Sequence, residues 1–268
     1  MASTVRRTRG VRGLCGVCAV AVIAIASTAT AEASVETWCA DELGGAWNGQ
    51  NCSTSVLSPR NATMSISANV PPDLQENPTA GPVVRGYVKN LVDGWRNTGA
   101  NMVRDSTYSV DYQMYSHGSV KSVVFHEFWQ TIGAPPNDAY RTFTFDVARG
   151  RRLELADLFN PGVDPLTALP PLVRPYLSAS LDAAAPPHDP GTYPFTPQEW
   201  EPMPDGSGFS GDYRAFAISD SELILYMPGA PMSHENPFPR DRFVWSMDGG
   251  TVVVHVPLAA LASILRPL

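Results

Sequence analysis

The sequence predicts an α+β protein in which a mixed, mostly antiparallel sheet is packed by one or two helices. Several short segments alternate apolar and polar residues, which is the pattern of strands with one buried face. One segment, residues 83–95, instead carries its apolar residues at helical spacing. The 25 Pro and 21 Gly indicate that turns and loops connect these elements.

The first elements follow from their local patterns. Residues 64–70 alternate and stop at a Pro-Pro pair, which predicts a strand. The helix expected over residues 83–95 presents one apolar face. Residues 108–115 and 119–131 flank a His-Gly turn and predict a hairpin, and residues 142–147 predict a further strand.

The remaining elements are shorter. Asp164 and Pro165 suit the N-cap and the first position of a helix that runs, with proline interruptions, toward Leu181. A strand pair is expected around residues 219–221. The last strand is expected over residues 251–256, followed by a short closing helix.

Composition and charge exclude several classes of function. The chain has 268 residues with 19 Lys+Arg and 26 Asp+Glu, so its formal charge of −7 leaves no basic surplus for nucleic acid. With 44% hydrophobic and 17% charged residues, it is a globular chain rather than a disordered one. Coiled coils and polytopic membrane proteins have other compositions.

The first 31 residues have the layout of a secretory signal peptide. Four arginines between positions 6 and 12 precede a short apolar run, residues 17–26, and residues 29–31 read Ala-Thr-Ala, a small-x-small cleavage site. The apolar run is shorter than the roughly 20 residues of a spanning helix, so we expect cleavage rather than a retained anchor.

Cleavage after Ala31 changes the charge and the cysteine count. It removes four arginines and no acid, which shifts the formal charge from −7 to −11. Cys39 and Cys52 remain as a pair in an exported chain, where a disulfide is expected and should stabilise the fold by about 3 kcal/mol. We therefore predict a secreted monomer, in the medium or the cell wall, that does not contact the membrane after cleavage.

The expected organisation has three parts. A signal peptide covers residues 1–31, an irregular disulfide-stapled segment covers residues 32–62, and one α+β domain covers residues 63–268, with a possible sub-boundary near residue 138. Residues 184–211 form a Pro-, Gly- and Asp-rich connection that is too long for an ordinary loop, which indicates a functional or mobile segment.

No complete hydrolase motif is present in the sequence. Residues 208–211 read Gly-Phe-Ser-Gly, one residue short of the Gly-x-Ser-x-Gly elbow, so Ser210 and His255 are only weak catalytic candidates. His126-Glu127 lacks the second histidine of a zincin and lies in a predicted strand, where neighbouring side chains face opposite sides. The sequence predicts neither a metal site nor a cofactor.

The long connection gathers aromatic and acidic residues. Tyr193, Phe195, Glu199 and Trp200 could form a binding loop that stacks on a sugar or grips a peptide. The alternative is that the aromatic side chains pin the loop onto the core, which apolar burial alone would explain.

Carboxylates for a glycosidase pair are also available, although the sequence cannot place them. The alternative is that they are solvated acids or helix caps. The candidates are Glu154, Asp157, Asp164, Glu199 and Glu201.

Several stretches together resemble the secreted mycobacterial immunogenic antigens known as the MPT or MPB family. Residues 140–146 (YRTFTFD) look like its Tyr-Lys-Ala-Phe strand, and residues 157–166 (DLFNPGVDPL) look like its link into the helix. Residues 212–220 (DYRAFAISD) and 254–257 (VHVP) are similar to later strands, and the two cysteines match its N-terminal pair. The C-terminal module is also similar to the extracellular domain of RsiV, an anti-sigma factor that senses lysozyme.

The resemblance implies a mixed α+β fold with a β-grasp-like C-terminal module, export, and no agreed catalytic residues. One relative is described as an esterase. Two departures concern function: residues 132–136 (IGAPP) lack the histidine that the family has there, and the connection 184–211 is longer than usual.

Two functions follow from these observations. The first is an exported, non-catalytic, antigen-like protein that binds an unknown protein or glycan of the cell envelope or host. The alternative is an envelope esterase or similar hydrolase. A third possibility is a lysozyme-type or glycan sensor, since an acidic surface attracts basic partners, an effect that salt weakens.

Overall fold

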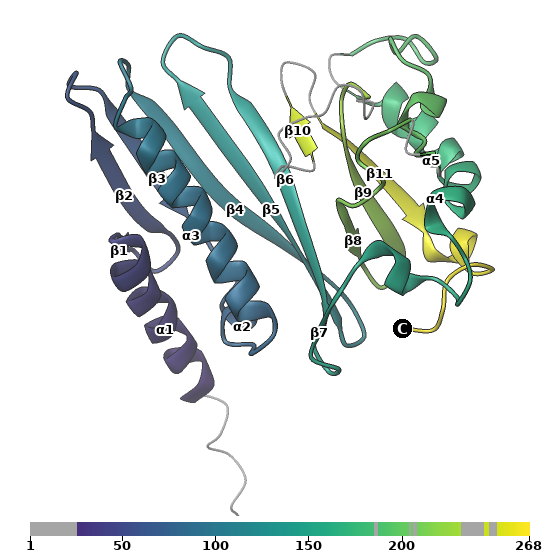
Figure 1. The fold of residues 1–268 in the computed structure, drawn as a ribbon, viewed down its shortest axis with the longest axis horizontal. Coiled ribbons are helices and arrows are strands. Elements are labelled where there is room, and N and C mark those ends of the chain that lie inside the picture. The colour runs from purple at the N-terminus through teal and green to yellow at the C-terminus, as the bar shows by residue number, and fades with distance from the viewer. Residues whose placement is uncertain (1–25, 185–186, 204, 206–207, 232–243, 247–250) are drawn as a thin grey trace, which may run out of the picture.

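The computed structural model describes residues 26–184, 187–203, 205, 208–231, 244–246 and 251–268 (Figure 1). Within them lie a large sheet ordered β1-β2-β3-β4-β5-β6-β10, whose strand β6 also pairs with β7, and a small sheet ordered β11-β9-β8. The predicted α+β class is confirmed. Figure 1 shows α1 and α3 in front of the large sheet, with α4 and α5 beyond the small sheet.

The large sheet contains the strands that alternation predicted. They are β3 (Thr63–Ala68), β4 (Ser106–His117), β5 (Val120–Thr131) and β6 (Asn137–Asp146). Two short strands, β7 (Arg151–Leu153) and β10 (Val244–Ser246), pair antiparallel with β6. Only β3 and β4 pair in parallel among the described strands, because α3 carries the chain back across the sheet between them.

The N-terminal segment is more regular than the irregular structure expected over residues 32–62. Helix α1 (Ala26–Leu43) leads into β1 (Ala46–Trp47) and β2 (Cys52–Leu57), and β2 extends the sheet beside β3. The helix forms because Val35, Trp38, Cys39 and Leu43 follow helical spacing and all are buried. The predicted signal peptide lies outside the described residues up to position 25, and residues 26–31 begin α1.

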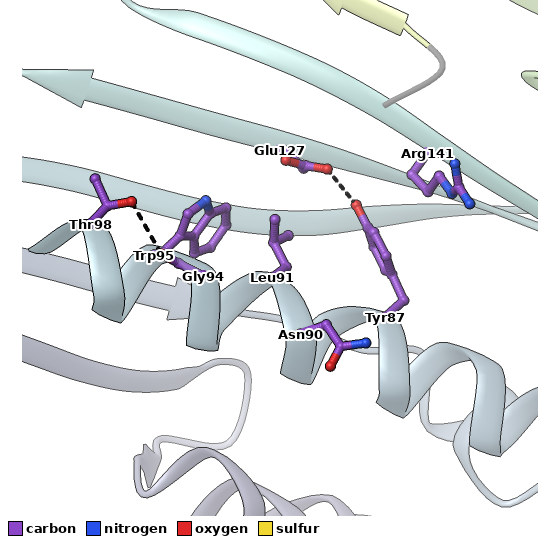
Figure 2. Close-up of a pocket in the computed structure, with 8 residues that line it drawn as sticks. All are labelled: Tyr87, Asn90, Leu91, Gly94, Trp95, Thr98, Glu127 and Arg141. Atoms are coloured by element: carbon purple, nitrogen blue, oxygen red, sulfur yellow. Dashed lines mark hydrogen bonds between the residues drawn. The ribbon is translucent and has the colours of Figure 1, made fainter. Parts of the chain in front are cut away.

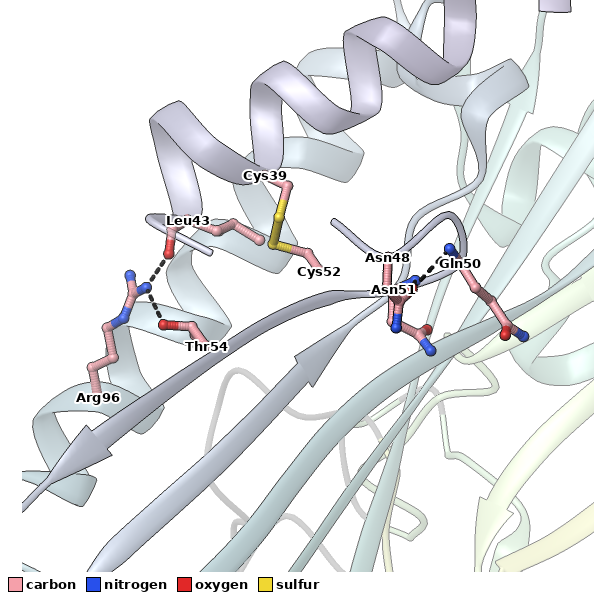
Figure 3. The surroundings of a disulfide bond; sticks show 8 residues. All are labelled: Cys39, Leu43, Asn48, Gln50, Asn51, Cys52, Thr54 and Arg96. Carbon is pink, nitrogen blue, oxygen red and sulfur yellow. Dashed lines mark hydrogen bonds between the residues drawn. A yellow bond between two sulfur atoms is a disulfide. The ribbon is translucent and has the colours of Figure 1, made fainter. Parts of the chain in front are cut away.

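The predicted disulfide is confirmed, and it ties α1 to β2 (Figure 3). Arg96 of α3 strengthens the same junction by donating to the Leu43 carbonyl and to the Thr54 hydroxyl, 3.2 Å away. Gly45 lies directly over the bridge. A Cβ atom on it would come within 2.6 Å of the Cys52 sulfur and 3.2 Å of the Cys39 sulfur. The sulfurs therefore leave no room for a side chain at this position.

Helix α3 (Ala80–Gly99) confirms the helix predicted over residues 83–95 and extends it at both ends. Val84, Val88, Val92 and Trp95 recur along one side and are 0–3% exposed, so this face packs on the large sheet. A one-turn helix, α2 (Pro72–Gln75), precedes it.

The small sheet stands against the other face of the large sheet. Its strands are β8 (Phe216–Ile218), β9 (Glu222–Pro228) and β11 (Thr251–Pro257), all antiparallel. The backbone N–H groups of Phe216 and Ile218 donate to the hydroxyls of Thr142 on β6 and Ser122 on β5, each at 3.1 Å. The open edge of β8 is thus hydrogen-bonded by side chains of the large sheet.

Helices cover the outer side of the small sheet. Asp164 caps α4 (Pro165–Ala168) as predicted, accepting from the Leu166 N–H, and α5 (Pro170–Asp182) follows with Pro175 inside it. The leucines and valine of α5 are buried in a second core with β9 and β11. Three short 3₁₀ turns, Leu155–Leu158, Pro197–Trp200 and Leu258–Leu261, complete the described elements. Residue 138, where a sub-boundary was expected, lies inside β6.

Candidate functional site

A groove runs between α3 and the part of the large sheet that the helix leaves uncovered (Figure 2). Its volume is about 420 Å³. Glu127 of β5 and Arg141 of β6 line the sheet side. The helix side is formed by Tyr87, Asn90, Leu91, Gly94, Trp95 and Thr98. We call this cavity the α3 groove.

A buried carboxylate lies on the sheet side of the α3 groove. Glu127 is only 2% exposed, and one of its oxygens accepts a hydrogen bond from the Tyr87 hydroxyl at 2.7 Å. Figure 2 shows the tyrosine reaching from the helix toward this carboxylate. Burying a carboxylate is unfavourable unless charge or hydrogen bonds compensate it, so its presence on an apolar strand face indicates a specific role.

The same groove presents two kinds of hydrogen-bond donor, the guanidinium of Arg141 and the indole N–H of Trp95. Phe125 and Glu127 are two residues apart on β5, so their side chains face the same side of the sheet. Arg141 on β6 is paired with Phe125 and therefore shares that side. Its guanidinium also lies 5.3 Å from the Phe143 ring centre. Trp95 is 3% exposed, and its indole N–H has no hydrogen-bond partner within the described residues. A groove of this kind can hold a polar group against an apolar wall.

His126 occupies the opposite face of the sheet from Glu127, as the strand alternation predicted. Its imidazole lies between two carboxylates, with Nδ1 3.7 Å from Asp111 and Nε2 3.9 Å from Asp138. It stacks on Tyr140, whose ring stacks in turn on Tyr226 of the small sheet. Asp111, followed by Asp138, raises the pKa of His126 to about 9. At neutral pH this imidazole is therefore a cation and a poor general base.

The contacts of His126 with Asp111 and Asp138 predict that the stability of the fold depends on pH. Because the folded pKa of about 9 lies above the ordinary value of 6.5, the stabilisation is complete below pH 6.5 and disappears as the pH rises through 9. A third of the side chain is exposed, so we expect a loss on the order of 1 kcal/mol between pH 6 and pH 10.

Urea unfolding of the protein and of His126→Gln at both pH values isolates this contribution, because the other titrating groups are common to both proteins. The difference in unfolding free energy between the two proteins should shrink at pH 10. A difference that does not change with pH would mean that folding leaves the pKa of His126 unshifted.

Ser210 and His255 are the candidate catalytic residues, and they belong to different segments at the small sheet. Ser210 precedes β8 at one edge, while His255 lies on β11 at the other. His255 is exposed, and its Nδ1 lies 2.9 Å from a Glu222 carboxylate oxygen. The Ser210 carbonyl accepts a hydrogen bond from the Arg214 guanidinium. Among the described residues, these two side chains share no hydrogen bond.

The predicted binding loop is packed down by its aromatic side chains. Trp200 is fully buried and donates its indole N–H to the Pro228 carbonyl at 3.0 Å. Tyr193 and Phe195 pack beside it, and the Tyr193 hydroxyl donates to the Gly229 carbonyl. Glu199 is exposed, and its carboxylate accepts from the Thr196 N–H in a capping box. This is the arrangement that the core-packing alternative predicts, and it leaves the indole inaccessible to a ligand.

The carboxylates considered for glycosidase chemistry all have structural partners. Glu154 and Asp157 form a capping box, and Asp164 and Glu199 cap further turns. Glu201 forms a two-point ion pair with Arg174, at 2.7 and 3.0 Å. Within the described part of the chain, no group of three His, Cys, Asp or Glu residues is placed to hold a metal ion. No described helix is both long and apolar enough to cross a membrane.

Glu127 is the residue that sequence reasoning passed over. It was considered only as part of an incomplete zinc motif. The available signal was its position in residues 123–129, where it interrupts an otherwise apolar face formed by Val123, Phe125 and Trp129. An acid in such a place is buried and needs a partner.

Comparison with known proteins gives relatives both in sequence and in structure. No family model matches the chain. It is 25% identical over 195 residues to the esterase Rv3036c of Mycobacterium tuberculosis, an alignment that covers 70% of this chain and 76% of that protein. Its fold is similar to that of a DUF3298 family protein from Pseudomonas aeruginosa, with a TM-score of 0.51, 14% identity, and coverage of 81% of this chain and 94% of that one.

A second DUF3298 structure, from Bacteroides fragilis, has a TM-score of 0.47 and 12% identity, with coverage of 81% of this chain and 92% of that one. The likeness to the Pseudomonas aeruginosa protein concerns the fold alone, because the identity is so low. The comparisons thus support an α+β fold like that of the DUF3298 protein from Pseudomonas aeruginosa and a mycobacterial relative in sequence. Membership of the secreted antigen family stays a prediction.

Proposed function

We propose that the chain is an exported, non-catalytic binding protein that holds a component of the cell envelope or of a host in the α3 groove. The observation that carries this proposal is the buried Glu127 carboxylate facing a cavity of about 420 Å³. Around it, Tyr87, Trp95 and Arg141 supply apolar surface, a phenol and a cation, the combination on which small-ligand sites are built.

The proposed export rests on the N-terminal sequence and on the disulfide. Residues 1–31 have the composition of a signal peptide, and the paired cysteines suit an oxidising compartment. Secretion, and any immunogenic role, are part of the proposal.

Filling the α3 groove tests where binding occurs. Gly94 lines the groove, and a Cβ atom on it would meet nothing within 4 Å, so Gly94→Met should fold and project its side chain into the cavity. We expect this variant to lose at least about tenfold in affinity for the material that the unaltered protein retains from fractionated cell-wall digests and host secretions.

Gly86→Met is the matched control. Gly86 lies on the same helix, has the same free space above it and is not among the residues that line the groove. Both changes replace a helical glycine and should raise stability by up to about 1 kcal/mol. Equal binding by the two variants would place the ligand elsewhere. Failure of the unaltered protein to retain any fraction would contradict the function itself.

The alternative function is an envelope esterase, and it is favoured by the sequence similarity to an esterase of Mycobacterium tuberculosis. Hydrolysis of p-nitrophenyl acetate and butyrate by the purified protein distinguishes the two functions. Turnover that Ser210→Ala and His255→Ala both abolish would support a serine esterase. Turnover that survives alanine substitution at every serine of the mature chain would contradict that mechanism.

A further inference from the structure

We propose a second binding site, for a neutral glycan, on the face of the large sheet opposite α3. A hollow of about 570 Å³ lies there, at the edge of the sheet where β3 and β4 begin and β5 ends. The residues that line it include Thr63, Ser65, Asp105, Thr107, Gln130 and Ile132. This site is separate from the α3 groove and does not rest on the function proposed for that groove.

Strand register extends the hollow along a polar face, and the row of that face nearest to the hollow carries no charge. Ser65 pairs with Thr107, which pairs with Gln130 on the next strand, and directly paired residues share one face of a sheet. The neighbouring row also carries hydroxyls and reaches an aromatic ring. It consists of Ser53, Ser67, Ser109 and Phe128. The first row contains no charged side chain, whereas the second continues from Phe128 to Asp138 on β6, whose carboxylate lies 3.9 Å from His126 Nε2.

The polar groups of the hollow are available to a ligand. Ser65, Thr107 and Gln130 are exposed, and within the described residues their side chains make no hydrogen bond to the protein. Asp105 is already engaged, since one of its oxygens accepts from the Thr63 N–H at 2.7 Å.

This chemistry favours a neutral sugar chain over other ligands. Hydroxyl and amide groups both donate and accept, which matches the hydroxyls of a sugar. Phe128 and the 65%-exposed Ile132 supply apolar surface for its C–H face. Charge at the rim is balanced, because Arg104 lies beside Gly133 and Asp105 lines the hollow, so neither a polyanion nor a polycation is selected.

A solvated sheet face is the competing explanation, since antiparallel sheets often face water on one side. Such faces usually carry charged residues throughout, and a row such as Ser65, Thr107 and Gln130, in which no side chain is charged, is unusual for an exposed surface. Direct titration with a sugar distinguishes the two explanations.

The probes are neutral tetrasaccharides of N-acetylglucosamine and of galactose, titrated into the full mature protein labelled with ¹⁵N. At least one of them should shift the amide signals of β3, β4 and the end of β5 in a saturable way. Ser65→Ala combined with Thr107→Val removes two hydroxyls while keeping shapes that suit a strand. We expect this variant to bind about tenfold more weakly.

Two control variants keep the outcome interpretable. Gln113→Ala changes an exposed side chain on the same face of β4, away from the hollow, and should bind normally. Gly94→Met blocks the α3 groove and should also leave glycan binding intact, which separates this site from the proposed function. No saturable shifts, shifts that Gly94→Met abolishes, or equal affinity for a sulfated tetrasaccharide would each overturn the proposal.

Discussion

Trp200→Ala is expected to lower the free energy of unfolding by about 3–5 kcal/mol. The indole is fully buried, and it is surrounded by Tyr193 and Phe195 at ring-centre distances of 6.0 Å each. Truncation leaves a cavity and also leaves the Pro228 carbonyl without its donor. Urea denaturation at neutral pH measures the change.

Gln198→Ala is the control in the same turn, because Gln198 is exposed and its substitution should change stability by less than about 0.5 kcal/mol. If the two variants were equally stable, the long connection would not be held by its tryptophan. The aromatic residues would then again be candidates for a binding loop. A large difference assigns them to the core.

Removing the disulfide is the second change with a large expected effect. Cys39→Ala combined with Cys52→Ala should cost about 3 kcal/mol, because the bridge closes a loop between residues 13 positions apart and so restricts the unfolded chain. Unfolding with and without a reducing agent provides the measurement. Reductant should destabilise the unaltered protein and leave the double variant unchanged.

Gly45→Ala provides an internal check on this junction. In the oxidised protein the new methyl group collides with both sulfurs, so the substitution should destabilise the fold. In the cysteine-free background the same substitution should cost less, since the sulfur atoms are gone and only the Ser53 carbonyl oxygen, 2.9 Å from the new Cβ atom, remains in close contact. Equal costs in the two backgrounds would show that the two sites do not interact.

The elements predicted correctly from sequence are those whose own residues determine them. Strand β3 and the first half of β4 alternate between buried and more exposed residues, the middle of β5 is buried on both faces, and α3 buries one continuous stripe. Asp164 caps its helix through a bond to a residue two positions away. These patterns are local, so tertiary contacts did not override them.

The elements that were missed depend on distant partners. Strand β2 is polar on its exposed side and is held by pairing with β3, so its own sequence, rich in Ser and Thr, gives little signal. Ser122 and Thr142 can be buried polar residues because their hydroxyls accept hydrogen bonds from the backbone of β8, which lies about 75–95 residues further along the chain.

The candidate sites also divide into those that the sequence alone predicts and those that depend on how the chain folds. Cys39 and Cys52 could be paired from their number and compartment. Ser210 and His255 were instead chosen for their chemistry alone, and among the described residues their side chains share no hydrogen bond. The α3 groove combines a helix and two strands that are separated in sequence by about 30–50 residues, and only the fold brings Tyr87 and Glu127 together.

Because they bond to the hydroxyls of Thr142 and Ser122, the amide protons of Phe216 and Ile218 can report on the junction between the two sheets. The amide protons of Phe216 and Ile218 lie on an edge strand, where exchange with solvent is ordinarily fast, yet here they are buried and bonded to side chains. Their rate of deuterium uptake therefore measures how often the small sheet separates from the large one. If that rate equals the rate for central β5 amides, the two sheets open only when the whole molecule unfolds.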